Sequence, residues 1–121
     1  MRDALQTYGK VARQIASPRE LEAILLLQTA SQLQSIHDNW TDKRHELETA
    51  LFDNRQLWLV LLTSVTSPDN PLPSEIRQNV ANLGIFVINR TLSLITDSRP
   101  ERLGSLITIN RELAARLLGR A

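Results

Sequence analysis

An uninterrupted run of six apolar residues, Leu57 to Leu62, lies near the middle of the chain and shortly before a proline-rich corner. Six consecutive residues point to every side of a helix, so a helix that contains this run cannot expose all of it to water. Three prolines between Ser67 and Pro73 then force the chain to turn, because proline disrupts a helix interior. The run therefore predicts a helix enclosed by other helices, and we expect most of the run to be core.

Length and composition predict one all-α domain, residues 1–121. A chain of 121 residues can bury a substantial core. Two tryptophans, two phenylalanines and one tyrosine stand against many leucines and isoleucines, which is typical of helices packed on helices. No apolar run approaches the roughly 20 residues that span a bilayer, and the N-terminus lacks the apolar region of a signal peptide. We therefore expect a soluble domain that is not exported by a cleaved signal.

Helix signals at the start of the chain predict a short helical segment followed by a long helix. Residues 1–16 suit a weak amphipathic helix that Gly9 interrupts. Ser17 then offers an N-cap hydroxyl, Pro18 suits the first helical position, and Glu20 can close a capping box. The first long helix is therefore expected to begin here, and residues 17–119 to form the bundle.

Similar signals mark the ends of three further helices. Polar residues at 37–39 end the first long helix, and the second is expected to start near Asp42, whose charge favours a helix N-terminus. The third follows Pro73, and residues 97–100 separate it from a fourth that ends before Gly119. The expected core positions recur every three or four residues: Leu47, Leu51, Asn54, Trp58, Leu61 and Val65 in the second helix, Ile76, Val80, Leu83, Val87 and Leu94 in the third, and Leu103, Leu106, Ile107, Asn110, Leu113, Ala114 and Leu117 in the fourth.

The third helix carries additional apolar residues in its middle. Ile85, Phe86 and Ile88 widen its apolar side, and Gly84 allows a close approach of another helix. We expect the middle of this helix to be largely buried. Four helices joined by short turns predict a small up-and-down bundle of four main helices, with the N-terminal segment as an additional short helix.

The sequence contains no motif that is typical of catalysis or of cofactor binding. There is no cysteine, and the four glycines form no phosphate-binding loop. His37 and His45 lie eight residues apart without a metal-binding motif, and no serine sits in a nucleophile elbow. We expect neither enzymatic activity nor a metal or other cofactor.

The balance of charge does not select a polyanionic partner. Lys and Arg number 14 against 13 Asp and Glu, which leaves a net charge of +1. Arginines do gather toward the C-terminus, at positions 111, 116 and 120, but acidic residues are interspersed. Direct nucleic-acid binding is therefore the less favoured interpretation, and contact with RNA remains an alternative to an ordinary solvated surface.

The apolar surface of the helices admits three interpretations. Trp58 and the apolar run at 23–27 can be core, or part of the apolar surface can accept an amphipathic helix of another protein. Asn54 and Asn110 interrupt otherwise apolar stripes, and a buried amide needs partners. They can bond to each other or hold the backbone of the proline corner, or they can fix the register of a bound helix. Self-association as a homodimer is a third possibility.

Several of these segments together resemble one known family. Asn54-Arg55-Gln56-Leu57-Trp58, the corner Ser67-Pro68-Asp69-Asn70-Pro71-Leu72-Pro73, and the late segment Leu106-Ile107-Thr108-Ile109-Asn110 are similar to the FlaF family of flagellar biosynthesis regulators from alphaproteobacteria. The similarity covers roughly residues 8 to 119 and includes Tyr8 and the segment from Ser17 to Glu22. The combination at this spacing is more specific than any one segment.

The resemblance implies a small cytoplasmic all-α protein that is needed for flagellin production and filament assembly. It would bind a terminal amphipathic segment of unassembled flagellin as a chaperone, and work alongside the FlbT regulator of flagellin mRNA. An RNA-associated regulator of that mRNA and a structural homodimer are the alternatives. Arg55 is the residue most expected to reach a partner and Trp58 the one most expected to be core. The partner-binding residues carried over from the family are Asn54, Arg55, Trp58, Asn70, Leu72, Ile107 and Asn110.

Overall fold

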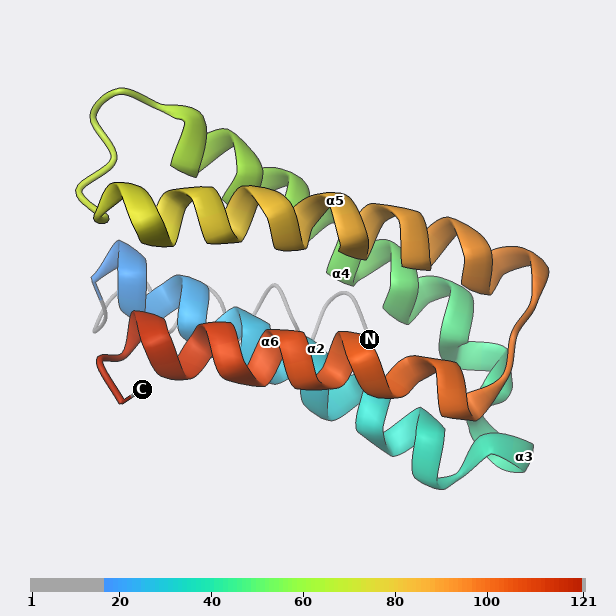
Figure 1. Ribbon diagram of the computed structural model, residues 1–121. Coiled ribbons are helices and arrows are strands. Elements are labelled where there is room, and N and C mark those ends of the chain that lie inside the picture. The colour runs from blue at the N-terminus through green and yellow to red at the C-terminus, as the bar shows by residue number, and fades with distance from the viewer. Residues whose placement is uncertain (1–16, 121) are drawn as a thin grey trace.

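The expected all-α fold of four main helices is confirmed by the computed structural model, which describes residues 17–120 (Figure 1). The chain runs up and down the bundle and reverses direction at each end. The helical segment expected at residues 1–16 lies outside the described residues. The four main helices are α2 (Pro18–Asp38), α4 (Leu47–Thr66), α5 (Ser74–Thr96) and α6 (Gly104–Leu117), with a 3-10 turn, η2 (Pro100–Leu103), before the last.

The start of α2 follows the predicted capping signal. The Oγ atom of Ser17 accepts a hydrogen bond from the backbone N–H of Glu20 at 3.2 Å and donates one to the Oε1 atom of the same residue at 3.1 Å. Pro18 occupies the first turn, where its missing N–H costs no helical hydrogen bond. The predicted start of the first long helix is thus confirmed.

The connection between α2 and α4 is less regular than expected. A helical turn, α3 (Trp40–Lys43), and a 3-10 turn, η1 (Arg44–Glu46), precede α4, so the prediction that the second helix starts near Asp42 was wrong. The Nζ atom of Lys43 donates to the Oγ atom of Ser35 at 2.7 Å, which ties this connection back to α2. The continuous helix begins only after the chain has completed the turn.

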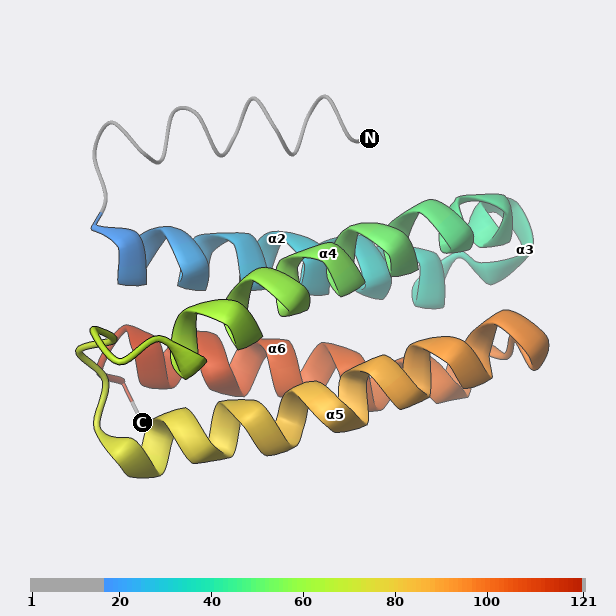
Figure 2. The same cartoon turned by 90° about the horizontal axis from the view of Figure 1, so that it is seen from above.

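The helices form two closely packed pairs. Helix α6 packs mainly on α2 and α5 mainly on α4, with α2 and α4 joining the two pairs. The view from above shows α5 and α6 along one side of the bundle and α2 and α4 along the other (Figure 2). Helices α5 and α6 meet at few points, so the bundle is least tightly closed between them.

Most of the predicted core positions are buried. All six positions expected in α4 and all seven expected between Leu103 and Leu117 are buried, and Trp58 is 0% exposed. Gly84 allows the close approach that was predicted: a Cβ atom added to it would lie 2.5 Å from a terminal methyl carbon of Leu62 on α4. The pair α4–α5 is therefore held together by direct helix-to-helix contact at this point.

The burial expected for the middle of α5 was wrong, and two of the six residues in the central run of α4 are exposed. Ile85 is 62% exposed and Phe86 40% exposed, while Leu59 and Val60 of the run are also exposed. Helix α5 packs mainly on α4, and α4 packs on α5 and α2, so apolar residues on their remaining sides face solvent. An apolar run six residues long exceeds what one side of a helix can bury.

Candidate partner-binding surfaces

Asn110 lies at the centre of a buried hydrogen-bond network that joins three helices. Its Oδ1 atom accepts from the indole Nε1 of Trp58 on α4 at 2.9 Å. Its Nδ2 atom donates to the Oδ1 atom of Asn54 on α4 at 2.7 Å and to the Oγ1 atom of Thr29 on α2 at 2.8 Å. All four side chains are buried, so the network, here called the asparagine node, belongs to the core.

Asn54 and Asn110 contact each other directly in the core. Of the options that the sequence left open for these amides, bonding to each other is the one that the structure shows. Both are 0% exposed, as is Trp58, and Ile107 is buried beside them at 4%. A role for these four residues in partner binding stays a prediction. Such a role would be indirect, through the positions of α4 and α6.

Asn70 holds the proline corner together. Its Nδ2 atom donates to the backbone carbonyl of Ser64 at 3.1 Å, which satisfies a carbonyl in the last turn of α4. Its Oδ1 atom accepts from the backbone N–H of Leu72 at 2.9 Å, and the Leu72 side chain is buried. The amide thus links the end of α4 to the segment that leads into α5, and its role toward a partner also stays a prediction.

Exposed apolar side chains gather along the outer side of the α4–α5 pair. Ile85, Leu92 and Ile95 of α5 are 62%, 56% and 61% exposed, and Phe52 and Leu59 of α4 are each 39% exposed. We call these five residues the α4–α5 stripe. Large apolar side chains that recur on one surface, rather than singly, are typical of a site where another molecule binds.

The helical register brings the two halves of the stripe to the same side. Leu62 and Gly84 mark where α4 and α5 touch, and the two helices run antiparallel. Leu59 lies about one turn before Leu62 and slightly around the helix from it. Ile85 follows Gly84 and turns outward in the same sense, because the chain direction is reversed. The stripe therefore lies on the side of the pair that faces away from the core.

Arg55 is the one partner-binding residue predicted from the sequence that is strongly exposed. It follows Phe52 by three positions and precedes Leu59 by four, so it extends from the same side of α4 as the α4 half of the stripe. Its guanidinium has no ion-pair partner within 4.0 Å between residues 17 and 120. Arg55 is therefore exposed beside the buried side of α4, and its role toward a partner stays a prediction.

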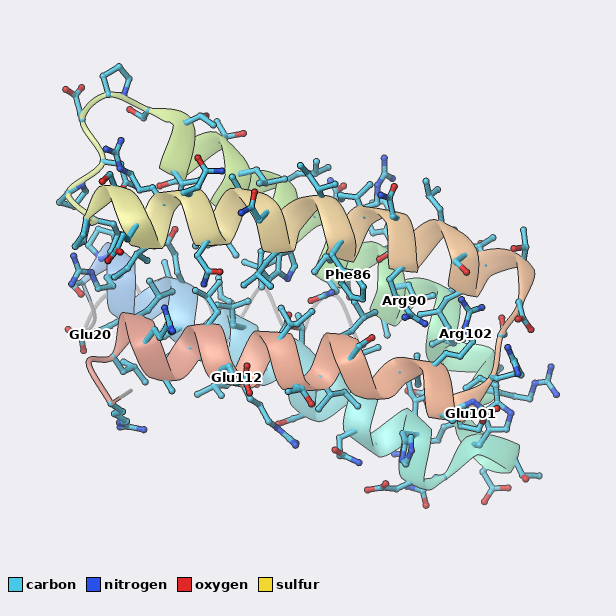
Figure 3. All side chains as sticks on the ribbon, viewed as in Figure 1. Glu20, Phe86, Arg90, Glu101, Arg102 and Glu112 are labelled. Atoms are coloured by element: carbon cyan, nitrogen blue, oxygen red, sulfur yellow. The ribbon has the colours of Figure 1, made fainter. Side chains whose placement is uncertain are left out.

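A second apolar surface lies between α5 and α6. A hollow of about 490 Å³ is lined by the side chains of Leu83 and Phe86 from α5 and of Ile109 from α6. Phe86 and Arg90 extend from α5 on the side toward α6, and the guanidinium of Arg90 lies 5.3 Å from the centre of the Phe86 ring (Figure 3). We call this hollow the α5–α6 groove.

The C-terminal arginines do not share one surface. The Nη1 atom of Arg111 donates to the Oε1 atom of Gln34 on α2 at 3.3 Å. Arg116 lines a smaller hollow of about 190 Å³ beside α5, together with Glu112. Arg111 and Arg116 thus face different neighbours, and an acidic residue accompanies the second, which does not favour a phosphate-binding surface here.

Two carboxyl groups on α2 have shifted pKa values. Partial burial raises the pKa of Glu22 above its ordinary value of 4.5, and the nearby charge of Arg19 opposes this effect. Hydrogen bonds from His37 and from Gln34 lower the pKa of Asp38. Neither group lies on the stripe or in the groove, so both concern stability rather than recognition.

Sequence reasoning missed the exposed half of α5. The signal was present: residues 85, 88, 92 and 95 repeat at intervals of three, four and three, beside the buried positions 80, 84, 87, 91 and 94. Two parallel apolar sets on one helix indicate two contact surfaces, of which the bundle uses one. Reading both as a single widened side led to the wrong expectation of burial.

Comparison with known proteins identifies the family. The family model described as flagellar protein FlaF matches residues 4–117. Searches of curated proteins and of solved structures find no match. None of the helices between residues 17 and 120 is long and apolar enough to cross a membrane. Because the family match covers nearly the whole chain, the protein belongs to the FlaF family of flagellar proteins.

Proposed function

We propose that the protein binds unassembled flagellin as a chaperone in the cytoplasm and thereby supports flagellin synthesis and export. Membership of a flagellar family supports a flagellar role. The observation that carries the proposal is the α4–α5 stripe, a set of large apolar side chains that the bundle leaves in solvent. A surface of this kind gains free energy when an amphipathic helix covers it.

The chemistry of flagellin fits such a surface. Its terminal segments are amphipathic and associate readily until they are polymerised, so a free subunit needs them covered. Binding on the stripe would mask one such segment and prevent premature association. The covered subunit could then be passed to the export apparatus, with FlbT as a functional neighbour in the control of flagellin synthesis.

The partner-binding residues would then divide by role. Arg55 would contact flagellin directly, since it extends from the stripe. The asparagine node would act through the position of α4, since its members are buried. Asn70 and Leu72 would fix the corner that sets α5 beside α4, and Ile107 would hold α6 in place.

Calorimetry with purified flagellin monomers tests the proposal. Full-length flagellin is expected to bind, and flagellin that lacks its terminal helices is expected to lose binding. Equal binding of the truncated and full-length forms would contradict the proposal. A parallel titration with flagellin mRNA tests the alternative: binding that falls steeply with salt and disappears on charge reversal at Arg111, Arg116 and Arg120 would favour an RNA-associated regulator.

The stripe itself is tested by a polar substitution. Ile85→Ser combined with Leu92→Ser removes two exposed apolar contacts and is expected to weaken flagellin binding while leaving thermal stability nearly unchanged. Val60→Ser is the matched control, because Val60 is 62% exposed like Ile85 but does not belong to the stripe. If the control weakens binding as much as the double variant, flagellin does not select the stripe.

A further inference from the structure

We infer that residues 1–16 of this chain dock as an amphipathic helix on the outer side of the junction between α2 and α4. The surface consists of Leu21 and Leu25 of α2 and of Asp53 and Leu57 of α4, and is here called the α2–α4 seam. It is separate from the stripe and from the groove. The inference does not involve flagellin, so its test is independent of the function proposed above.

Leu25 lies on the side of α2 that faces away from α6. Gln34 marks the side toward α6, because its side chain accepts a hydrogen bond from Arg111. Leu25 precedes Gln34 by nine residues, which is about two and a half helical turns, so its side chain extends in the opposite direction. Helix α4 is the other long helix on which α2 packs. Leu25, and Leu21 about one turn before it, therefore lie on the outer side of α2 next to α4.

Asp53 lies on the matching side of α4. Leu62 marks the side of α4 toward α5, where it lies against Gly84. Asp53 precedes Leu62 by nine residues, so it extends away from α5 and lies next to α2. The view from above shows α2 and α4 along the same side of the bundle (Figure 2).

The seam is more buried than the outer side of a bundle usually is. Asp53 is 7% exposed and takes part in an interaction of its own, and Leu57, about one turn further along α4, is half-buried. Leu21 and Leu25 are half-buried as well. Carboxylates are rarely buried to this extent at the surface of a protein. The burial supports a further segment of the chain over this junction.

Leu25 and Leu57 lie at the same level of the bundle. Thr29 and Asn54 both contact Asn110, and α2 and α4 run antiparallel (Figure 1). Leu25 precedes Thr29 by four residues and Leu57 follows Asn54 by three, so each lies about one turn from the asparagine node toward the proline corner. The seam thus presents two half-buried leucines side by side.

The sequence of residues 1–16 separates apolar from polar positions. Leu5, Tyr8, Ala12 and Ile15 recur at intervals of three, four and three, which places them on one side of a helix. Polar residues fall on the opposite side of the same helix: Asp3, Gln6, Lys10, Arg13 and Gln14. Such a helix can bury one side on the seam and keep the other side in solvent.

The connection at Ser17 brings the segment to the seam. Ser17 has extended backbone angles, with φ −65° and ψ 163°, and the following Pro18 disfavours a helical conformation in the residue before it. A helix over residues 1–16 therefore cannot continue straight into α2. Tyr8 lies nine residues before Ser17 and Leu25 eight residues after it, about 13 Å and 12 Å along their helices. A helix that turns back beside α2 thus brings Tyr8 level with Leu25.

Covalent attachment favours this segment over any other occupant. It is joined to the bundle at the end of the seam, so its effective concentration there is on the order of millimolar. A helix of this segment is about 24 Å long, which equals the length of α2 from Pro18 to Leu33 and covers the whole seam. The family match begins at residue 4 and so includes nearly all of the segment.

Disulfide formation in the full chain tests the inference, because the chain contains no cysteine of its own. Tyr8→Cys is combined with Leu25→Cys or with Leu57→Cys to give two seam pairs. The matched controls combine Tyr8→Cys with Leu59→Cys of the stripe or with Ile109→Cys of the groove. Under mild oxidation, the faster seam pair should form an intramolecular disulfide about tenfold faster than either control pair.

Two results of this experiment would overturn the inference. A control pair that is oxidised as fast as the seam pairs would place the segment on another surface. A seam disulfide that forms between two chains, seen as a dimer on a non-reducing gel, would identify a second copy as the source of the segment.

A stability measurement tests the inference without cysteines. Leu5→Ser combined with Tyr8→Ser removes apolar contacts from the seam and should lower Tm by about 5 °C or more. Gln6→Ser combined with Lys10→Ser is the matched control on the polar side of the same segment, and should change Tm by less than about 2 °C. A Tm of the first variant equal to that of the wild type would overturn the inference, whether or not the protein binds flagellin.

Discussion

Trp58 donates its indole N–H to the Oδ1 atom of Asn110 across the core, over a distance of 2.9 Å and between residues 52 positions apart in the chain. The contact joins the most apolar helix to the last one and consumes the only polar atom of the tryptophan side chain. The same amide also reaches Asn54 and Thr29. One side chain therefore satisfies polar groups from two other helices.

Replacing Asn110 by Leu should destabilise the fold strongly. The substitution keeps the side-chain size but leaves Trp58, Asn54 and Thr29 without their shared partner in the core. The free energy of unfolding should fall by about 2 to 4 kcal/mol. Urea denaturation measures this change, and Asn89→Leu on the exposed side of α5 serves as the control, with an expected change below about 0.5 kcal/mol. Equal changes in both variants would contradict the importance of the node.

Gly84→Ala should destabilise the contact between α4 and α5. The added methyl group would lie 2.5 Å from the Leu62 side chain, so the helices must shift or the leucine must move. We expect a loss of about 1 to 3 kcal/mol in the free energy of unfolding. Leu62→Ala in the same chain should restore part of this loss, since it removes the clashing group. Losses that simply add in the double variant would contradict the contact.

Gly104→Ala provides the matched control for that experiment. Gly104 has ordinary helical angles, and an added Cβ atom would meet nothing within 4 Å. Alanine should therefore be tolerated, and should stabilise the protein by up to about 1 kcal/mol because it restricts the unfolded chain. A destabilisation as large as that of Gly84→Ala would show that the effect comes from glycine itself and not from crowding.

Asn70→Ala should loosen the proline corner. The substitution removes the donor to the Ser64 carbonyl and the acceptor for the Leu72 N–H. The expected loss is about 1 to 2 kcal/mol in the free energy of unfolding. Asp69→Ala is the neighbouring control, because the Asp69 side chain is exposed. If both variants unfold at the same urea concentration, the amide does not hold the corner.

Glu22→Gln should change how stability depends on pH. Burial raises the pKa of Glu22 in the folded state, so the folded protein binds this proton more tightly than the unfolded chain. The resulting contribution to stability is fully present below the ordinary pKa and is lost as pH rises through the folded-state pKa. Glutamine keeps a neutral group at every pH, so Glu22→Gln should raise Tm at pH 7.

The pH series completes that test. The difference in Tm between Glu22→Gln and wild type should shrink as the pH falls toward about 4, where the glutamate itself becomes neutral. Glu48→Gln changes an exposed glutamate of α4 and should follow the wild type throughout. A Tm difference that is constant with pH would contradict burial of the Glu22 carboxyl as its cause.

The ends of the helices could be predicted from the sequence where the capping or helix-breaking residue is a close neighbour in the chain. The Ser17 hydroxyl and the prolines of the 67–73 corner act on their own neighbours, so the bounds near them could be predicted. The start of α4 could not, because Lys43 reaches back to Ser35 across the turn, and this contact depends on the relative position of two helices. The repeat that placed Asn54, Trp58 and Asn110 in the core was likewise local.

Hydrophobic periodicity could not predict that the α4–α5 stripe is exposed. Hydrophobic spacing identifies which residues share a side of a helix, but not whether a neighbouring helix covers that side. Ile85 and Val87 differ little as residues, yet one is 62% exposed and the other 0%. The difference arises from the packing of α5 on α4, which no single segment encodes. Arg55 was predicted as a partner-binding residue because it lies within a segment that resembles the family. Arg90 lies outside those segments and was not predicted.

The asparagine node has a consequence for how the fold opens. Hydrogen bonds fix the mutual register of α2, α4 and α6, whereas α5 contributes no side chain to the node and is held along most of its length by apolar contact. Native-state hydrogen exchange should therefore show amide protons in the middle of α5 exchanging through smaller openings than those of α4. The helix that carries most of the exposed apolar surface is thus the one that can adjust its position at the lowest free-energy cost.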